Sequence, residues 1–178
     1  IVDWGFNAWG GKYPPWDADD AVPTKVAGEL GLPVFNADIV MEGGAVDVNG
    51  AGTLLTTTSC LLNRNRNPQC SKNEIEGLLK AYYGQRQVIW LGEGIAGDDT
   101  DGHVDDLARF IDARTIVTAV ESDPLDVNFK VLADNRRRLA RARDTEGRPF
   151  DIVELPMPRP VVHEGMRLPA TYVNFYFV

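Results

Sequence analysis

The chain has 178 residues, of which 44% are apolar and 25% charged, a composition typical of a globular protein with one sizeable core. Its net charge of −8 argues against a nucleic-acid partner, because phosphates bind basic surfaces. No apolar run approaches the roughly 18 residues of a membrane span, and residues 1–11 lack the order of a signal peptide. We therefore expect a soluble, cytoplasmic protein with neither membrane nor nucleic-acid partners.

The first half of the chain predicts a helix and a β-hairpin. Residues 17–31 begin with acids, carry Pro23 in the first turn and end at a glycine, which is typical of a short amphipathic helix. Apolar and β-branched residues at 34–41 continue into 45–48 past a Gly-Gly pair. The turn signal Asn49-Gly50 then precedes a strand at 53–58, which completes the predicted hairpin.

The second half of the chain predicts two helices and four strands. Ser71 and Glu74 form a capping box before a helix that ends at Gly84, and a strand follows at 87–91. Two further strands are predicted at 104–111 and 115–120. A helix beginning at Asp123-Pro124 presents Leu125, Phe129, Leu132 and Leu139 on one face, and a strand follows at 150–155.

The succession of strand, strand, helix and strand occurs twice. Glu42 and His103 stand near the start of the two units, 61 positions apart, so we predict a repeat architecture of ββαβ units. A third unit begins at Tyr172. Because the chain starts without methionine and stops in a strand-like run, we expect residues 1–178 to be a single incomplete domain, stabilised by missing units or by a homo-oligomer.

Thiols, imidazoles and basic clusters are sparse. Cys60 and Cys70 are too few for a disulfide framework, so we expect reduced thiols. His103 and His163 cannot form a multi-histidine metal site, and we expect no metal. His163 lies in the proline-rich stretch 156–169, which is typical of a surface connection. The arginines at 136–143 follow acids on a predicted helix and indicate a solvated face.

The densest group of candidate catalytic side chains is the acidic run around His103. On a strand alternate residues share a face, so His103 and Asp105 would reach one ligand. Nearby carboxylates stabilise an imidazolium, which makes His103 a candidate general acid/base. The alternative is a calcium loop over Asp98–Asp106, although the spacing differs from an EF-hand. Glu42, before two glycines, is the corresponding candidate in the preceding unit, or a solvated acid.

Motifs along almost the whole chain resemble the agmatine deiminase family. They are Phe6-Asn7-Ala8-Trp9-Gly10-Gly11-Lys12-Tyr13, Glu42-Gly43-Gly44, Thr53-Leu54-Leu55-Thr56-Thr57, Cys60-Leu61-Leu62-Asn63, Asn65-Arg66-Asn67-Pro68, the run 97–105, and Tyr172-Val173-Asn174-Phe175-Tyr176. That family belongs to the guanidino-group-modifying enzymes, with the bacterial peptidyl-arginine deiminases. The resemblance implies an α/β pentein fold, a five-bladed propeller of ββαβ units, of which this chain would be about half.

The resemblance also implies roles for four residues. His103 would be the general acid/base, Asp105 a guanidinium-binding carboxylate, and Glu42 the group that orients the histidine and contacts the guanidinium. Asp99 would help to line the substrate channel. The nucleophilic cysteine of the family lies nearer its C-terminus, and a further substrate-binding aspartate lies upstream, so neither is expected here. Cys60 matches a structural cysteine of the family.

The implied activity is hydrolysis of agmatine to N-carbamoylputrescine and ammonia, as in putrescine biosynthesis, through a covalent cysteine adduct and without a cofactor. The partner would be a small cationic guanidino substrate. Two alternatives stay open: a peptidyl-arginine deiminase acting on arginine residues, and a non-catalytic pentein binding module. The second would have no use for Glu42, His103 and Asp105 together.

Overall fold

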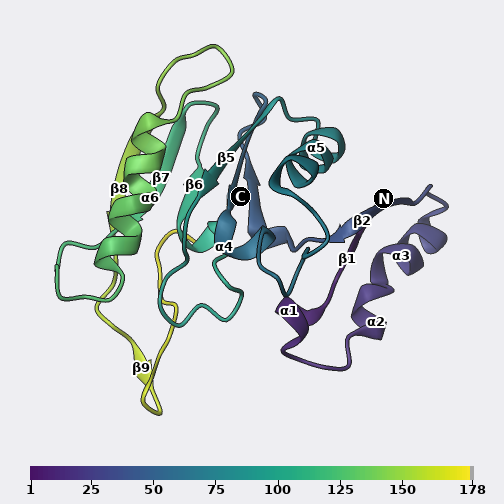
Figure 1. Cartoon of the computed structure of the whole chain (residues 1–178), viewed down its shortest axis with the longest axis horizontal. Helices are drawn as coiled ribbons and strands as arrows, with labels where there is room; N and C mark the ends of the chain where they lie inside the picture. The colour runs from purple at the N-terminus through teal and green to yellow at the C-terminus, as the bar shows by residue number, and fades with distance from the viewer. Residues whose placement is uncertain (177–178) are drawn as a thin grey trace.

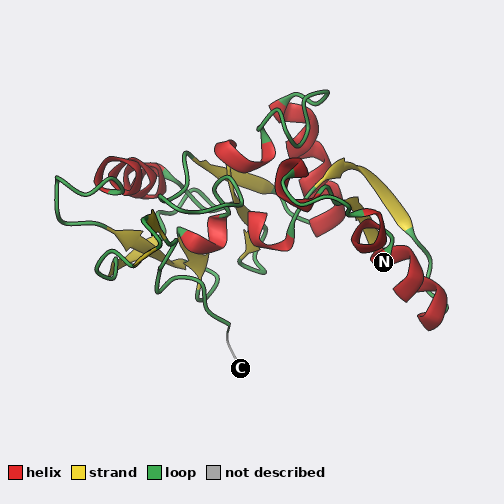
Figure 2. Cartoon of the chain, turned by 90° about the horizontal axis from the view of Figure 1, so that it is seen from below, coloured by secondary structure: helices red, strands yellow, loops and turns green. Residues whose placement is uncertain are grey.

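The computed structural model describes residues 1–176, which form an α/β array of three neighbouring units (Figure 1). The first contains β1 (Val2–Gly5), α2 (Asp17–Asp20), α3 (Val22–Leu30) and β2 (Phe35–Val40). The second contains β3 (Val46–Val48), β4 (Thr53–Thr57), α5 (Lys72–Tyr83) and β5 (Gln87–Leu91). The third contains β6 (Ala108–Phe110), β7 (Thr115–Val120), α6 (Phe129–Arg141) and β8 (Asp151–Pro156). The view in Figure 2 shows the array to be elongated.

The second and third units share one topology. In each, the first strand pairs antiparallel with the second, and the strand after the helix pairs in parallel with the second. A parallel neighbour requires a crossover, which α5 and α6 provide. The predicted ββαβ repeat is therefore confirmed for these two units.

Local signals fix the second unit as predicted. The Ser71 hydroxyl accepts a hydrogen bond from Glu74 N, and the Glu74 carboxylate accepts one from Ser71 N at 2.7 Å, which forms the capping box of α5. Gly84 ends the helix with a positive φ of 63°. In the hairpin, Asn49 Oδ1 accepts from the backbone N–H groups of Ala51 and Thr53.

The prediction that residues 34–41 and 45–48 form one continuous strand is wrong. β2 pairs in parallel with β1, a strand that was not predicted, and belongs to a different sheet from β3. A 3₁₀ helix, η1 (Gly43–Ala45), separates the two strands, so 45–48 does not continue 34–41. The predicted helix at 17–31 forms as two pieces, α2 and α3. Gly31 ends α3 in the left-handed conformation, as expected.

In the third unit, two predicted boundaries are wrong. The strand predicted from residue 104 starts with a 3₁₀ helix, η2 (Val104–Asp106), and only β6 is extended. The helix predicted from Asp123 begins at Phe129, and Leu125 is 92% exposed. Asp123 and Asp126 each accept a hydrogen bond from the backbone N–H two residues ahead, so they stabilise turns before the helix.

The segment after β8 lies on the surface as predicted. It contains the unpredicted antiparallel pair β9 (Val162–His163) and β10 (Met166–Arg167), and His163 is exposed. Residues 172–176 form no helix or strand, and the third unit predicted to begin at Tyr172 stays a prediction. Residues 177–178, which belong to the predicted strand, lie outside the described residues.

Two hydrophobic cores hold the units together. One gathers side chains of the second unit beneath α5, with Ile75, Leu79 and Leu54 fully buried. The other lies beneath α6 in the third unit and includes Leu132 and Leu139, but also reaches Leu55 and Leu91 of the second unit. Because the second core crosses between units, their relative position is fixed by packing.

The outer face of α6 is charged. On α6, Arg136 pairs with Glu154, and Arg138 pairs with Asp134 at 2.7 Å, which confirms the solvated basic face. In residues 1–176 no helix combines the length and the apolar character that a membrane crossing requires.

Asn135 on α6 should contribute strongly to stability. It is buried, its Oδ1 accepts from Gly92 N at 2.7 Å, and its Nδ2 donates to Glu93 O at 2.9 Å. We expect Asn135→Ala to lower the free energy of unfolding by about 2–4 kcal/mol, because the buried Gly92 N–H and the part-buried Glu93 carbonyl lose their partners. Arg137→Ala, on the exposed face of α6, should change it by less than about 0.5 kcal/mol. Urea titration of both variants tests this, and equal losses would contradict it.

Candidate active site

Glu42 and His103 occupy equivalent backbone positions in successive units. Glu42 immediately precedes η1, and His103 immediately precedes η2. Because η1 and η2 are in contact, two residues 61 positions apart in sequence meet at the junction of the second and third units. Both side chains are buried, and Glu42 Oε2 lies 3.4 Å from His103 Nε2.

The second oxygen of Glu42 binds Arg66, whose guanidinium is buried. Arg66 Nε donates to Glu42 Oε1 at 2.6 Å, Nη1 donates to Asp101 Oδ2 at 2.8 Å, and Nη2 donates to a backbone carbonyl. A buried charge is stable only when it is paired and hydrogen-bonded. Arg66 therefore connects Glu42 to the loop before His103, a role that the sequence did not indicate.

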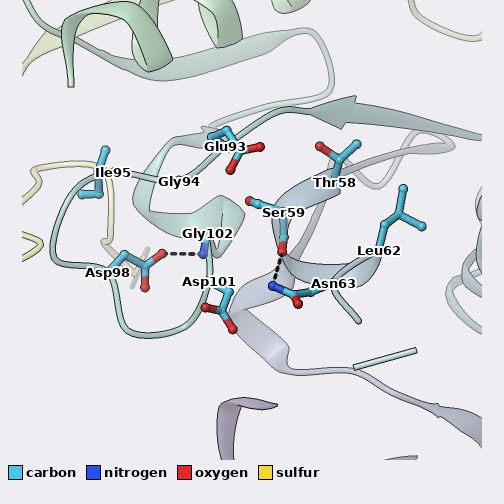
Figure 3. A pocket seen from close by; sticks show the side chains of 10 residues that line it. All are labelled: Thr58, Ser59, Leu62, Asn63, Glu93, Gly94, Ile95, Asp98, Asp101 and Gly102. Carbon is cyan, nitrogen blue, oxygen red and sulfur yellow. Dashed lines mark hydrogen bonds between the residues drawn. The ribbon is translucent and has the colours of Figure 1, made fainter. Parts of the chain in front are cut away.

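The loop 92–102 is organised by the Asp98 carboxylate. Asp98 Oδ2 accepts from the backbone N–H groups of Gly102 at 2.8 Å and of His103 at 3.1 Å, and Oδ1 accepts from Thr100. Figure 3 shows the bond to Gly102. Within residues 1–176 the loop carboxylates do not converge on a common point, so the calcium alternative lacks the oxygen cluster that it needs.

Two pockets near the unit junction differ in polarity. Towards α4 (Thr58–Leu61) lies a polar pocket of about 440 Å³, whose lining includes Ser59, Glu93 and Asp98 (Figure 3). Glu42 and His103 instead line a separate pocket of about 360 Å³, whose walls include Trp4, Phe6 and Trp9. An aromatic wall excludes water and suits the flat face of a delocalised cation.

Gly44 allows the catalytic candidates to approach closely. A Cβ atom at Gly44 would lie 2.5 Å from His103 Nδ1 and 2.7 Å from Asp105 Oδ2, so no larger residue fits without displacing them. Asp105 and His103 thus lie close together, as predicted. The reason given was wrong, because Asp105 lies on η2 and not on a strand.

Burial and charge act oppositely on the carboxylates. Burial alone would raise the pKa of Glu42, but its hydrogen bond to His103 and the charge of Arg66 outweigh burial and lower that pKa. For Asp105, burial dominates and raises the pKa, despite the nearby charges of His103 and Arg109. The surroundings therefore favour the ionised form of Glu42 and disfavour that of Asp105.

The other predicted residues lie outside this pair. Asp99 is exposed, bonds the Tyr13 hydroxyl and lies 3.5 Å from Lys12 Nζ, and its place in a substrate channel stays a prediction. Cys60 on α4 is fully buried, as expected, and burial raises the pKa of its thiol. Both cysteines are free thiols.

Solved structures place this architecture among the deiminases. A C. jejuni agmatine deiminase, in a cysteine-to-serine variant with substrate bound, matches with a TM-score of 0.88 and 41% identity over 99% of this chain and 52% of its own. The agmatine deiminase of Enterococcus faecalis matches with a TM-score of 0.88 and 37% identity, over 98% of this chain and 54% of its own. The fold class is therefore α/β, as in these enzymes.

The chain belongs to the family described as Porphyromonas-type peptidyl-arginine deiminase, whose model matches residues 1–178. Among curated proteins, the agmatine deiminase of Medicago truncatula is 37% identical over 98% of this chain and 53% of its own length. The chain spans about half the length of the curated relatives that it matches.

Arg66 should be essential to the stability of the site. Arg66→Met leaves Glu42 buried without its ion pair, so we expect a loss of about 3–5 kcal/mol in the free energy of unfolding. Arg64→Met, an exposed arginine two residues away, should have little effect. In urea titrations the double variant Arg66→Met with Glu42→Gln should recover part of the loss. Similar small effects at both arginines would contradict the assignment.

Asp106 should make stability depend on pH. Burial raises the pKa of Asp106 from 3.8 to about 6, against the opposing hydrogen bond from Asn174. The folded chain then holds a proton that the unfolded chain releases, so stability falls as pH rises from about 4 to about 6. Asp106→Asn should remove this decline and raise stability at pH 7 by about 1–3 kcal/mol, while exposed Asp151→Asn keeps it. An unchanged pH profile of unfolding in Asp106→Asn would show that its carboxyl is not responsible.

Proposed function

We propose that this protein deiminates a small guanidinium substrate, with agmatine as the leading candidate, and that this chain supplies the acid/base and carboxylate part of the active site. The buried contact between Glu42 and His103, beside Asp105 and open to an aromatic-walled pocket, carries the proposal. Membership of a deiminase family and similarity to agmatine deiminases support it.

The reaction divides into two steps that share one histidine. A thiolate from a cysteine outside this chain attacks the guanidinium carbon, and ammonia leaves as His103 donates a proton to it. Water that His103 deprotonates then attacks the covalent thiouronium adduct, which releases the thiolate and N-carbamoylputrescine. A cysteine-to-serine variant is the form in which the C. jejuni enzyme is described with substrate bound, which is consistent with a cysteine nucleophile.

The carboxylates suit a planar cation. A guanidinium group presents paired N–H donors, which match a carboxylate as in an arginine ion pair. Asp105, whose Oδ2 lies beside Gly44 and close to His103, is the candidate for such a bond. Both oxygens of Glu42 already have partners, so its part is to hold the His103 imidazole in position. Because the proposed product is N-carbamoylputrescine, the proposal assigns this step to putrescine biosynthesis.

Peptidyl-arginine is the second candidate substrate, because the matching family model carries that description. Relatives and solved structures named as agmatine deiminases favour the small substrate. Parallel assays of ammonia release from agmatine and from a peptide with an internal arginine separate the two. Turnover of neither by a folded, complete protein would favour the non-catalytic alternative.

His103 provides the test of mechanism, and His163 its matched control. In the complete protein, His103→Ala should lower the turnover of agmatine at least about 100-fold, because a positioned acid/base contributes about 10²- to 10⁴-fold. His163→Ala replaces an exposed histidine on β9 and should leave turnover unchanged. Chromatographic measurement of N-carbamoylputrescine follows both. Near-normal turnover in His103→Ala, with wild-type circular dichroism, would exclude the role assigned to it.

A further inference from the structure

Glu42 and His103 share a third neighbour that the proposed reaction does not use. The Cys60 thiol is fully buried and donates to Glu42 Oε2 at 3.4 Å, the same oxygen that lies 3.4 Å from His103 Nε2. One ligand atom from each of the three residues lies within 4.8 Å of the others. We propose that Glu42, Cys60 and His103 form a binding site for a divalent transition-metal ion, of which Zn²⁺ is the best match.

The spacing fits tetrahedral coordination. Zinc bonds of about 2.0–2.2 Å to nitrogen and oxygen, and of about 2.3 Å to sulfur, place neighbouring ligand atoms roughly 3.3–3.6 Å apart. The two distances of 3.4 Å from Glu42 Oε2 already lie in this range. Cys60 Sγ and the ligand nitrogen of His103 lie within 4.8 Å of each other, so a side-chain adjustment of at most about 1 Å brings them to the tetrahedral spacing.

The surrounding structure holds the three ligands in place. Thr57 Oγ1 accepts from Cys60 N at 3.2 Å and donates to the carbonyl of Gly102, the residue before His103, at 2.5 Å. Thr57 therefore ties two of the three ligand segments together. Arg66 donates to the other oxygen of Glu42, Oε1, and so holds this carboxylate in place. His103 Nδ1 and Asp105 Oδ2 both lie beside Gly44, and a carboxylate near the second ring nitrogen supports a metal-bound imidazole.

Charge and ligand type favour zinc over calcium or magnesium. Thiolate and imidazole are ligands for zinc, whereas the two harder cations require oxygen. The Arg66 guanidinium opposes a cation, but Asp101 pairs with it at 2.8 Å. Binding converts the Cys60 thiol to a zinc-bound thiolate and releases one proton to solvent, so affinity should rise with pH. Glu42 and His103 face the pocket of about 360 Å³, which leaves a fourth position for water.

Cobalt absorption tests the site directly. The 178-residue chain has two cysteines, so a thiolate-to-cobalt charge-transfer band on addition of Co²⁺ reports one of them. We expect the band in the native chain and in Cys70→Ser, and its loss in Cys60→Ser. Zinc should displace cobalt and abolish the band, and this competition measures the zinc affinity. No band in the folded native chain, or a band retained in Cys60→Ser, would overturn the proposal.

A second pair of variants keeps the test independent of Cys60 replacement. His103→Gln should weaken zinc binding by about 100-fold or more, since even the neighbours of metal ligands change affinity by about 10- to 100-fold. His163→Gln, far from the site on exposed β9, should bind as the native chain does. Metal-free thermal unfolding verifies that each variant folds. Equal zinc affinity of the two histidine variants would also overturn the site.

A bound cation would occupy His103 Nε2 and block proton transfer, a consequence that rests on the function proposed above. The cobalt measurement requires no turnover, so the two proposals can fail separately. Zinc binding without loss of deimination would contradict the acid/base role of His103 and leave the metal site standing. Deimination by the complete protein that zinc does not inhibit, together with the absence of a cobalt band in the 178-residue chain, would contradict the metal site alone.

Discussion

The paired charge of Arg66 is the interaction on which the geometry of the site depends. A guanidinium without access to water is tolerated only between partners, and this one binds Glu42 on one side and Asp101 on the other. Glu42 belongs to the start of the second unit, and Asp101 to the loop that leads into the third. Arg66 therefore holds the two sides of the unit junction at a fixed distance, and His103 follows Asp101 by two residues.

Elements determined by local signals could be predicted from the sequence. The capping box of α5, the turn at Asn49 and the strands β5 and β7 depend on neighbouring residues, and they form where expected. The partner of β2 could not be predicted, because β1 is a short parallel neighbour whose register depends on contacts distant in sequence. The start of α6 was misplaced because an aspartate stabilises a turn as well as a helix cap.

The site could be predicted only in part from the sequence. The spacing of 61 residues correctly brought Glu42 and His103 to equivalent places in two units, since a repeat converts sequence distance into spatial proximity. Asp105 was correctly placed beside His103 on an incorrect secondary structure. Arg66 belongs to a family motif, Asn65-Arg66-Asn67-Pro68, but its structural role could not be predicted, because arginines are seldom buried and the motif does not show which carboxylates Arg66 would pair with.

Glu42 and His103 differ in the number of hydrogen bonds that their side chains make. Glu42 is kept ionised by His103 and Arg66, and both of its oxygens already accept from partners, so it has little capacity to take up a proton during a reaction. His103 has a single polar side-chain partner among the described residues, at the long distance of 3.4 Å, and it lines the aromatic pocket. A carboxylate whose ionised form is stabilised can orient a neighbouring imidazole. In the reaction proposed for this family member, proton transfer would therefore run through His103, with Glu42 orienting its Nε2 atom.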